Sequence, residues 1–449
     1  MIEWGLSFGS HDSGIAVFDN DQLVFATEGE RWSGIKHDKY LPPNLIKHVT
    51  DTYGEPQEIY YFEDWEIKEH RRKVAGQPPK AKPRMIAGKH YNDWNISGHH
   101  LSHCAYGYYT SPYDDCTTIV VDSIGEWDTM SIWRCAGGSV SKTYSWHYPQ
   151  SLGLMYTAAT LAGGWNGNDE EFKMMGASAF GKGQKEYNIL KDLWDSGFNF
   201  HKGWNYEGND QFEIAAGAQR LFEKWMKLLT KYVQGPLVLV GGCAMNSKMN
   251  GKFKQDLYVP PAPTDAGSAV GCVLAHKKKK IKMDGFHGYN IDKEPNIKFI
   301  LEELKEGAVV GVAHGKAEFG PRALGNRSIL ADPFRDGWKT ALNRIKNREP
   351  WRPYGVMVRE DDMGHFFHRP RKSPYMNVCF KAKETVPKDL VHHDGTVRVQ
   401  TIDKDHTLWD IFDEFPLVVN TSLNVKGKPI VNDEKDVMEM RNASNLIIL

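Results

Sequence analysis

Residues 2–27 read IEWGLSFGSHDSGIAVFDNDQLVFAT, a stretch in which short apolar runs alternate with polar, glycine-containing turns. This pattern predicts three strands, over residues 2–8, 15–18 and 23–27, separated by turns at 9–14 and 19–22. Antiparallel strands around a Gly/Asp/Ser turn form a small loop whose backbone amides can hold phosphate. The stretch therefore predicts both the start of a sheet and an anion-binding loop.

Outside this stretch, strand and helix patterns alternate. Residues 236–241 (PLVLVG) predict a buried strand, and residues 265–276 (DAGSAVGCVLAH) predict a helix that begins with small residues. A longer helix is expected over residues 211–232. This alternation is typical of the α/β class.

A change of composition marks a domain boundary. Residues 276–296 (HKKKKIKMDGFHGYNIDKEPN) are first basic and then rich in Gly, Asn and Pro, so the boundary is expected near residues 283–296. Beyond it we expect a helix over residues 297–306 and a strand over 308–313. A second strand, over 417–420, is expected to lead into a Thr-Ser-Leu-Asn turn.

The overall composition limits the possible partners. A length of 449 residues suffices for two or three domains, and an apolar fraction of 41% suffices to bury their cores. The net charge of -1 gives no general case for nucleic acid or membrane binding. A secretory signal pattern and an apolar stretch of about 20 residues are both missing, so a cytoplasmic protein is expected. The six cysteines include no CxxC pair, which indicates reduced, buried thiols.

Two histidines and two aspartates form a candidate metal site. His99 and His103 are four residues apart, so on a helix they share a face and can reach one cation, although half-buried structural histidines are about as common. Asp122 ends the apolar run 118–121, and Asp265 opens the helix predicted at 265–276. Two imidazoles and two carboxylates suit Fe(II), Zn(II) or Mn(II), and ligand type alone does not choose among them.

Cations are dense in the second half of the chain. Residues 320–328 (GPRALGNRS), 343–349 (NRIKNRE) and 351–354 (WRPY) place arginines among prolines, glycines and aromatics. An exposed charged helix would instead show regular Glu/Lys spacing. We therefore interpret the segment as an anion site, because guanidinium groups bind phosphate in a bidentate manner.

These motifs, together with HHLSH at 99–103, VDSIGE at 121–126 and PAPTDAGSAVG at 261–271, resemble the O-carbamoyltransferase family. The resemblance implies an α/β protein with an N-terminal actin-like, sugar-kinase-like domain over residues 1–285 and a C-terminal YrdC-like domain over 295–449. It also implies that His99, His103, Asp122 and Asp265 bind a metal, usually iron.

The same resemblance implies roles for further residues of the first domain. His11 would be the general base that deprotonates the acceptor hydroxyl, and Lys36 would lie near the transferred group. Two segments depart from the usual family pattern, at residues 177–181 (ASAFG) and at Leu423. The implied nucleotide-binding residues are Gly125, Gly241, Gly242 and Asn246, and the implied acceptor-side residues are Asp12, Glu171 and Lys173.

In the second domain the resemblance implies that carbamoyl phosphate and ATP, with Mg(II), are converted to carbamoyl adenylate. The carbamoyl group would then pass to an acceptor hydroxyl. The residues implied to neutralise phosphate are Arg322, Arg327, Lys346, Arg348, Arg352 and Arg398. Asn420 and Ser422 would orient the carbamoyl group.

Two alternatives remain open. The acceptor could be a hydroxymethylated pyrimidine nucleotide or DNA base, in which case the basic runs at 71–73, 80–84 and 277–282 could contact phosphates; solvated surface is the preferred interpretation of these runs. A non-catalytic, actin-like nucleotide-binding regulator is disfavoured because the metal and arginine motifs are intact. The sequence chooses neither the acceptor nor the oligomeric state, and no membrane partner is expected.

Overall fold

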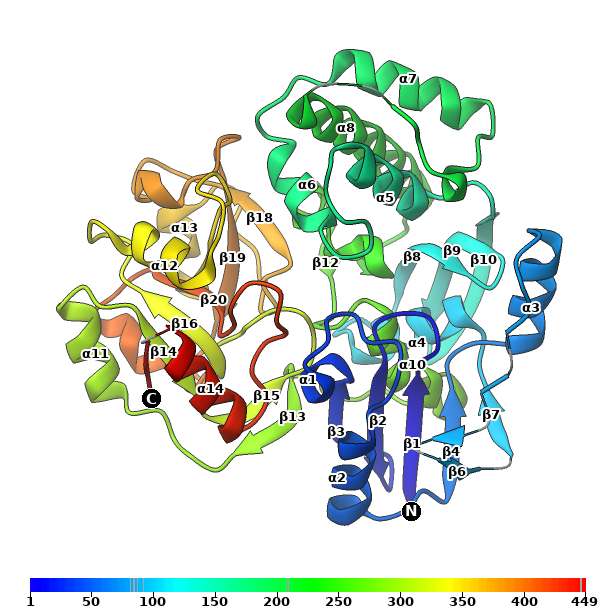
Figure 1. The fold of residues 1–449 in the computed structure, drawn as a ribbon, viewed down its shortest axis with the longest axis horizontal. Coiled ribbons are helices and arrows are strands. Elements are labelled where there is room, and N and C mark those ends of the chain that lie inside the picture. Colours follow the sequence, from blue (N-terminus) through cyan, green and yellow to red (C-terminus); the bar gives the residue numbers. More distant parts are fainter. Residues whose placement is uncertain are drawn as a thin grey trace. The chain divides into compact units, whose positions relative to one another are not determined.

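The computed structural model describes the whole chain except residues 81, 84, 87, 92, 207, 209 and 445. Helices and strands alternate along it, which confirms the predicted α/β class (Figure 1). The chain forms two compact units. Unit 1 comprises residues 1–33, 37–246 and 253–284, and unit 2 comprises residues 34–36, 247–252 and 285–449.

Unit 1 begins with a five-stranded sheet in the order β3-β2-β1-β4-β7. The first three strands are antiparallel neighbours, as their turn residues require, and β4 and β7 continue the sheet in parallel. The three strands predicted from residues 2–27 are therefore confirmed. Their bounds are β1 (Ile2–Ser7), β2 (Gly14–Asp19), β3 (Gln22–Glu28), β4 (Glu58–Tyr61) and β7 (Trp94–Ile96).

A second five-stranded sheet of unit 1 has the order β10-β9-β8-β11-β12. The strand predicted at 236–241 is β11, which pairs in parallel with β8. All four residues of β11 are buried, which explains its continuous apolar run. The bounds are β8 (Cys116–Gly125), β9 (Asp128–Ala136), β10 (Ser139–His147), β11 (Leu237–Val240) and β12 (Leu257–Tyr258).

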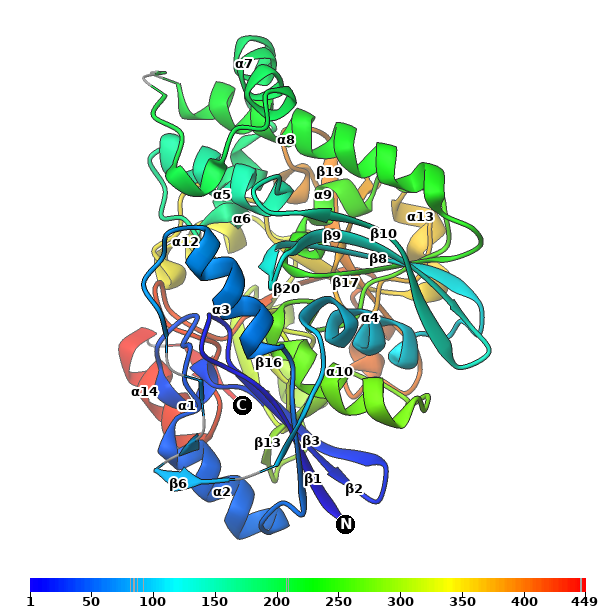
Figure 2. The same ribbon diagram turned by 90° about the vertical axis from the view of Figure 1, so that its right-hand side faces the viewer.

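Two helices connect these sheets. α10 (Asp265–Lys277) packs against β1 and β2, α4 (His99–Thr110) packs against β8 and β11, and the two helices contact each other (Figure 2). Both helices are buried around nearly their whole circumference, as expected for helices covered on several sides. The first turn of α4 and the first residue of α10 therefore lie inside the unit.

The remaining helices of unit 1 include the long helix expected at 211–232. It is an α-helix only to Leu229 and ends in the 3-10 turn η2 (Thr230–Tyr232); Asp210 caps its start by accepting the Phe212 N–H at 2.8 Å. This long helix is α8 (Gln211–Leu229), and the other helices are α1 (Glu30–Ser33), α2 (Pro43–Tyr53), α3 (Trp65–Val74), α5 (Leu152–Ala162), α6 (Glu171–Ala177) and α7 (Gln184–Asp195).

Unit 2 is built on a seven-stranded mixed sheet in the order β18-β19-β17-β20-β16-β14-β21. The predicted strand at 417–420 is β20, but it extends through Thr421 and Ser422, which the sequence assigned to a turn; both residues pair with β16. The bounds are β14 (Val310–Ala313), β16 (Arg327–Ala331), β17 (Gly355–Arg359), β18 (Val378–Lys381), β19 (Thr396–Ile402), β20 (Val418–Ser422) and β21 (Ile447–Ile448).

The core of unit 2 includes α11, the helix predicted at 297–306. Its residues Ile300 and Leu304 are one turn apart and pack with Val310, Leu330 and Val418 of the sheet. α11 spans Ile297–Lys305. The other elements of this unit are α9 (Ser247–Asn250), α12 (Trp338–Lys346), α13 (Met363–Phe366), α14 (Glu434–Ser444) and a two-stranded antiparallel sheet of β13 (Phe286–Ile291) and β15 (Gly315–Glu318). Among the residues that the structure describes, no helix combines the length and the apolar character needed to cross a bilayer.

Candidate metal centre and anion site

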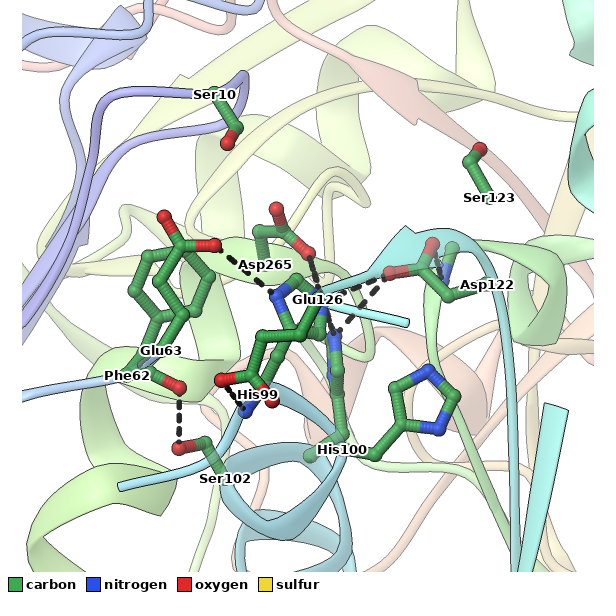
Figure 3. A network of polar contacts seen from close by, with 12 residues as sticks. Ser10, Phe62, Glu63, His99, His100, Ser102, Asp122, Ser123, Glu126 and Asp265 are labelled. Atoms are coloured by element: carbon green, nitrogen blue, oxygen red, sulfur yellow. Dashed lines mark hydrogen bonds and ion pairs between the residues drawn. The ribbon is translucent and has the colours of Figure 1, made fainter. Parts of the chain in front are cut away.

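The predicted metal ligands converge inside unit 1 (Figure 3). His99 and His103 lie on successive turns of α4, Asp265 is the first residue of α10, and each of these side chains is at most 3% exposed. Asp122 lies within β8 and not at its end, which corrects the sequence interpretation. The pairing of β8 with β9 is irregular between Val121 and Gly125, and Asp122 lies in this irregular segment.

The spacing of the four side chains fits one cation. The Nε2 atom of His99 lies 3.0 Å from Asp122 Oδ2 and 3.2 Å from His103 Nε2, which in turn is 3.2 Å from Asp265 Oδ1. One ligand atom from each residue lies within 4.8 Å of the other three. Ligand atoms about 2.1 Å from a shared tetrahedral ion would be roughly 3.4 Å apart. The four residues can therefore hold a metal.

The four side chains also neutralise one another. Burial by itself lowers the pKa of His99, but Asp265 and Asp122 outweigh it and hold this pKa well above the usual value. The pKa of His103 is raised in the same way, and the two histidines counteract burial and lower the pKa of Asp122 and Asp265. A cation that binds here must therefore displace protons from the imidazoles.

Gly125 supports this centre in a way that the sequence did not predict. A Cβ at Gly125 would lie 2.4 Å from the His99 ring, so only glycine lets β8 approach the histidines this closely. Glu126 follows, and its Oε1 accepts the backbone N–H of His99 at 3.1 Å. Gly125 was predicted to bind nucleotide; the structure gives it a packing role beside His99.

The glycine pair of the GGCAMN segment also lies beside the centre. Gly241 has φ +90°, and a Cβ there would lie 2.2 Å from Val121 O. The Gly242 N–H donates to Asp122 Oδ1 at 3.3 Å. Asn246, expected to hold adenosine, instead exchanges hydrogen bonds of 2.9 and 3.1 Å with the Gln219 amide in a buried network. In this structure the network accounts for both polar atoms of the Asn246 amide, and its nucleotide-binding role stays a prediction.

The loop that carries His11 reaches the same cluster. His11 Nε2 lies 4.0 Å from Asp265 Oδ2, and its Nδ1 lies 3.2 Å from Asp12 Oδ2. Partial burial alone would lower the pKa of His11, but Asp265 and Asp12 raise it to about 10. In the metal-free site His11 is therefore an imidazolium at neutral pH, and it must lose this proton before it can act as the general base predicted from the sequence.

Sequence reasoning missed His37, the second imidazole that contacts Asp12. His37 Nδ1 lies 2.6 Å from Asp12 Oδ1, and its Nε2 lies 3.3 Å from Asp169 Oδ1. Asp12 and His37 both have positive φ, of 49° and 54°, a backbone conformation that is costly for residues other than glycine and that often marks functional sites. The sequence feature that pointed to His37 was the KHD stretch at residues 36–38, in which Lys36 was the predicted functional residue.

The two acceptor-side candidates of α6 make local contacts. Glu171 Oε1 accepts from Thr157 Oγ1 at 2.8 Å, and Lys173 is buried and forms an ion pair with Glu170. Burial raises the pKa of Cys243 well above its usual value, and the charges of Asp122 and Glu171 add to this effect. Glu171 therefore lies near the glycine-pair segment.

In unit 2 the predicted arginines form a cation cluster. Burial and the charge of Arg398 hold the pKa of Arg322 well below its usual value, and burial with Arg352 lowers that of Arg348 to about 9. In the part of the chain that the structure describes, the buried Nε atoms of Arg322, Arg348 and Arg398 have no hydrogen-bond partner. Like charges this close, with donors left unused, are arranged for an anion.

Lysines join this cation cluster. Arg348, Arg352 and Lys36 add to burial in holding the pKa of Lys346 well below its usual value, and residues 34–36 cluster with unit 2. Lys36 was predicted to act in the first domain, and its segment belongs instead to the unit that carries the cations. The Lys346 Nζ donates to Ser422 O and to Asn424 Oδ1, both at 2.6 Å.

Arg327 does not belong to the cation cluster, which corrects its predicted role. It is fully buried, and its guanidinium donates to backbone carbonyls, at 2.6 Å to His314 and 3.0 Å to Tyr289. Asn420 likewise donates to Ala323 O at 3.0 Å, although its buried Oδ1 has no hydrogen-bond partner and remains a candidate ligand atom. Arg327 therefore holds the backbone around the GPRALGNRS loop.

Glu318, which the sequence did not indicate, holds the same loop. Its Oε1 accepts the backbone N–H groups of Leu324, Asn326 and Arg327 at 2.8, 3.0 and 3.0 Å. Glu318 is 1% exposed, and its buried Oε1 accepts from all three of these amide donors. It fixes the loop that presents Arg322.

Some residues of the basic runs considered for nucleic-acid binding are structural, so the surface interpretation of these runs is wrong in part. Arg71 is buried and donates to Glu126 O at 2.9 Å, and Arg72 pairs with Glu69 at 3.0 Å. Lys280 donates to Tyr108 O at 2.7 Å near the end of α4. Ala81 and Arg84 of the run 80–84 lie outside the described residues.

Comparisons with known proteins identify the family of this chain. The family models "Carbamoyltransferase N-terminus" and "Carbamoyltransferase C-terminus" match residues 68–274 and 301–449. The 3'-hydroxymethylcephem-O-carbamoyltransferase of Amycolatopsis lactamdurans is 25% identical and aligns over 98% of this chain and 96% of its own length. Nodulation protein NolNO of Sinorhizobium fredii is 26% identical, with 95% and 76% covered.

Among solved structures, the ROK hexokinase from Thermus thermophilus is similar with a TM-score of 0.29 and 12% identity, over 61% of this chain and 99% of the hexokinase. The two family models together cover most of the chain, one on each side of the boundary between the units. The chain belongs to the carbamoyltransferase family and is an enzyme of that family.

Proposed function

We propose that this enzyme forms carbamoyl adenylate from carbamoyl phosphate and ATP and transfers the carbamoyl group to an acceptor hydroxyl. The observation that carries the proposal is the cation cluster of unit 2, in which the buried Nε atoms of Arg322, Arg348 and Arg398 have no hydrogen-bond partner among the described residues. Both proposed substrates carry phosphate, the anion that guanidinium groups bind best. We further propose a YrdC-like fold for unit 2 and an actin-like fold for unit 1.

Adenylation would proceed in unit 2 largely through electrostatics. Water would first displace phosphate from carbamoyl phosphate to leave carbamate, and a carbamate oxygen would then attack the α-phosphorus of ATP and expel pyrophosphate. Arg322, Arg348 and Arg398 would neutralise the phosphate oxygens during this attack, with Mg(II) on the nucleotide. The unpartnered Oδ1 of Asn420 is the proposed acceptor for the carbamoyl N–H.

Transfer would use the metal centre of unit 1. A divalent ion held by His99, His103, Asp122 and Asp265 would supply Lewis acidity toward an oxygen of the bound intermediate. Fe(II) is our first choice, and Zn(II) and Mn(II) suit the same ligands. Once Asp265 is a metal ligand, its charge no longer raises the pKa of His11, so the imidazole can become neutral and accept the hydroxyl proton.

The acceptor is proposed to carry a primary hydroxyl, by analogy with the relative named for hydroxymethylcephem. A hydroxymethylated pyrimidine would fit the same chemistry. The internal contacts of Arg71, Arg72 and Lys280 provide no support for a nucleic-acid backbone at these residues.

The test separates the two half-reactions. Wild type and the variants Arg322→Met and His103→Ala are incubated with ATP, and pyrophosphate release is measured with and without carbamoyl phosphate. We expect carbamoyl-phosphate-dependent release in wild type and in His103→Ala, and a loss of at least about 10²-fold in Arg322→Met, as for other lost electrostatic contacts to a transition state. Unchanged release in Arg322→Met would refute the role of the cation cluster.

A further inference from the structure

A buried ion pair lies directly behind one of the metal ligands. Glu63, which follows β4, is 1% exposed, and Lys68 on α3 is 6% exposed; their side chains form a salt bridge. Glu63 Oε2 lies 3.7 Å from Nδ1 of His99 (Figure 3). Neither residue belongs to the four-ligand set.

The two ring nitrogens of His99 face different partners, the other ligands on one side and this ion pair on the other. Nε2 faces the other ligands, 3.0 Å from Asp122 Oδ2, while Nδ1 points to the opposite side. Nδ1 is buried and makes no hydrogen bond to any described residue, and Glu63 provides a carboxylate within ion-pair distance. A histidine that binds metal usually donates its other ring N–H to a carboxylate, which fixes the tautomer and the ring orientation.

The same pair extends to the loop that carries His11. The Lys68 Nζ donates to Ser10 Oγ at 2.6 Å, next in sequence to His11, while it also holds Glu63. A continuous set of polar contacts therefore runs from Ser10 through Lys68 and Glu63 to His99. These contacts join the loop that carries His11 to the metal ligand His99.

We propose that Glu63 is a positioning residue that holds His99 with its Nε2 lone pair toward the metal, and that Lys68 holds Glu63 in place. The inference rests on the proposed metal site. In the alternative, Glu63 and Lys68 form an ordinary structural ion pair, as Glu3 and Lys277 do in the same unit.

Glu3 offers a close control for Glu63. It is 2% exposed, lies 2.6 Å from the Lys277 Nζ, and accepts from the Tyr60 hydroxyl at 3.2 Å. Glu63 has the same kinds of partner, Lys68 and the Tyr61 hydroxyl at 3.3 Å. The two glutamates differ in that only Glu63 forms an ion pair with a residue of the metal cluster.

The experiment titrates metal-free protein with Co(II) and records binding and the visible absorption spectrum for wild type, Glu63→Ala and Glu3→Ala. We expect Glu63→Ala to bind Co(II) about 10- to 100-fold more weakly with an altered spectrum, the usual effect of losing such a partner, and Glu3→Ala to bind within about twofold of wild type.

If an alanine variant does not fold, Glu63→Asp and Glu3→Asp repeat the comparison, because aspartate keeps the charge beside the lysine and withdraws the carboxylate by one methylene group. Wild-type affinity in the Glu63 variant, or an equal loss in the Glu3 variant, would overturn the inference. Failure of wild type to bind Co(II) would instead overturn the proposed metal site, and the inference with it.

Discussion

The metal centre and the cation cluster are both buried collections of charge, and they differ in how that charge is balanced. In unit 1, two imidazoles face two carboxylates. The carboxylates raise the pKa of the imidazoles and the imidazoles lower the pKa of the carboxylates, so both kinds of group favour their charged forms. In unit 2, arginines and lysines lower the pKa of one another, and Glu349 pairs with Arg352 at the side of the group. The charges of the first set offset one another, whereas those of the second would be offset by the anion that we propose binds there.

The largest expected effect distinguishes a metal ligand from a neighbouring buried histidine. His103→Ala should reduce the bound metal at least about tenfold, because a tetrahedral site that loses one of its protein ligands binds weakly. Elemental analysis of purified protein measures it. His100→Ala is the control, since His100 is 3% exposed on the same helix but contacts Ser131 at 2.7 Å. Equal metal content in the two variants would contradict the assignment.

The next effect separates two arginines of unit 2 that the sequence had treated alike. Arg327→Met should lower the free energy of unfolding by at least about 3 kcal/mol, because several buried carbonyls lose their donor. Arg398→Met should instead cost little or even stabilise, because it removes like-charge repulsion.

Their response to anions should be opposite. Carbamoyl phosphate at about 100 times its Kd stabilises a protein by about 2.7 kcal/mol, and this gain should be lost in Arg398→Met but remain in Arg327→Met. Urea denaturation with and without carbamoyl phosphate measures both quantities. An anion response that Arg327→Met loses and Arg398→Met keeps would exchange the roles assigned to them.

A smaller effect concerns the pH dependence of the metal centre. The pKa values of His99 and His103 are raised in the metal-free site, so these histidines hold protons that a metal must displace. Metal affinity should therefore fall about tenfold per pH unit for each proton released as the pH decreases.

The stability of the metal-free protein should follow the opposite trend. The histidine contribution is complete below the unfolded-state pKa of about 6.5 and is lost as the pH rises through the raised pKa values. Titrations with Co(II) at several pH values, beside thermal unfolding without metal, test both statements. Metal affinity that stays constant between pH 6 and 8 would show that the histidines are already neutral.

The smallest effect concerns the half-exposed pair of Asp12 and His37. Asp12 and Asp169 overcome partial burial and raise the pKa of His37 to about 10. The stability from this pair should therefore be complete below pH 6.5 and be lost toward pH 10. His37→Gln should cost about 0.5–1 kcal/mol at pH 6, the usual value of an exposed ion pair.

His37→Asn serves as its control, because the Asn amide can replace Nδ1 as donor to Asp12 and tolerates positive φ. Urea denaturation at pH 6 and near pH 10 compares the variants. A loss in His37→Gln that is equal at both pH values would mean that packing, and not charge, accounts for it.

Local periodicity accounts for what was predictable from the sequence. The i, i+4 spacing of His99 and His103 placed both on one face of α4, and the Gly/Asp/Ser turns between apolar runs predicted the first three strands. The arginines among Pro and Gly indicated an anion site. Such features depend on residues close together in the chain, so the sequence by itself determined them, together with the α/β class and the family resemblance.

The partners of each charged side chain depended on tertiary structure alone. Glu63 and His37 have no local motif, because Glu63 lies 36 residues before His99, its ion-pair partner, and His37 lies 25 residues after Asp12. Arg322 and Arg327 stand in one motif, yet the first leaves a buried donor unpaired and the second bonds to backbone carbonyls. The direction in which each arginine points, and so its role, is set by the packing around the loop, which no spacing along the chain encodes.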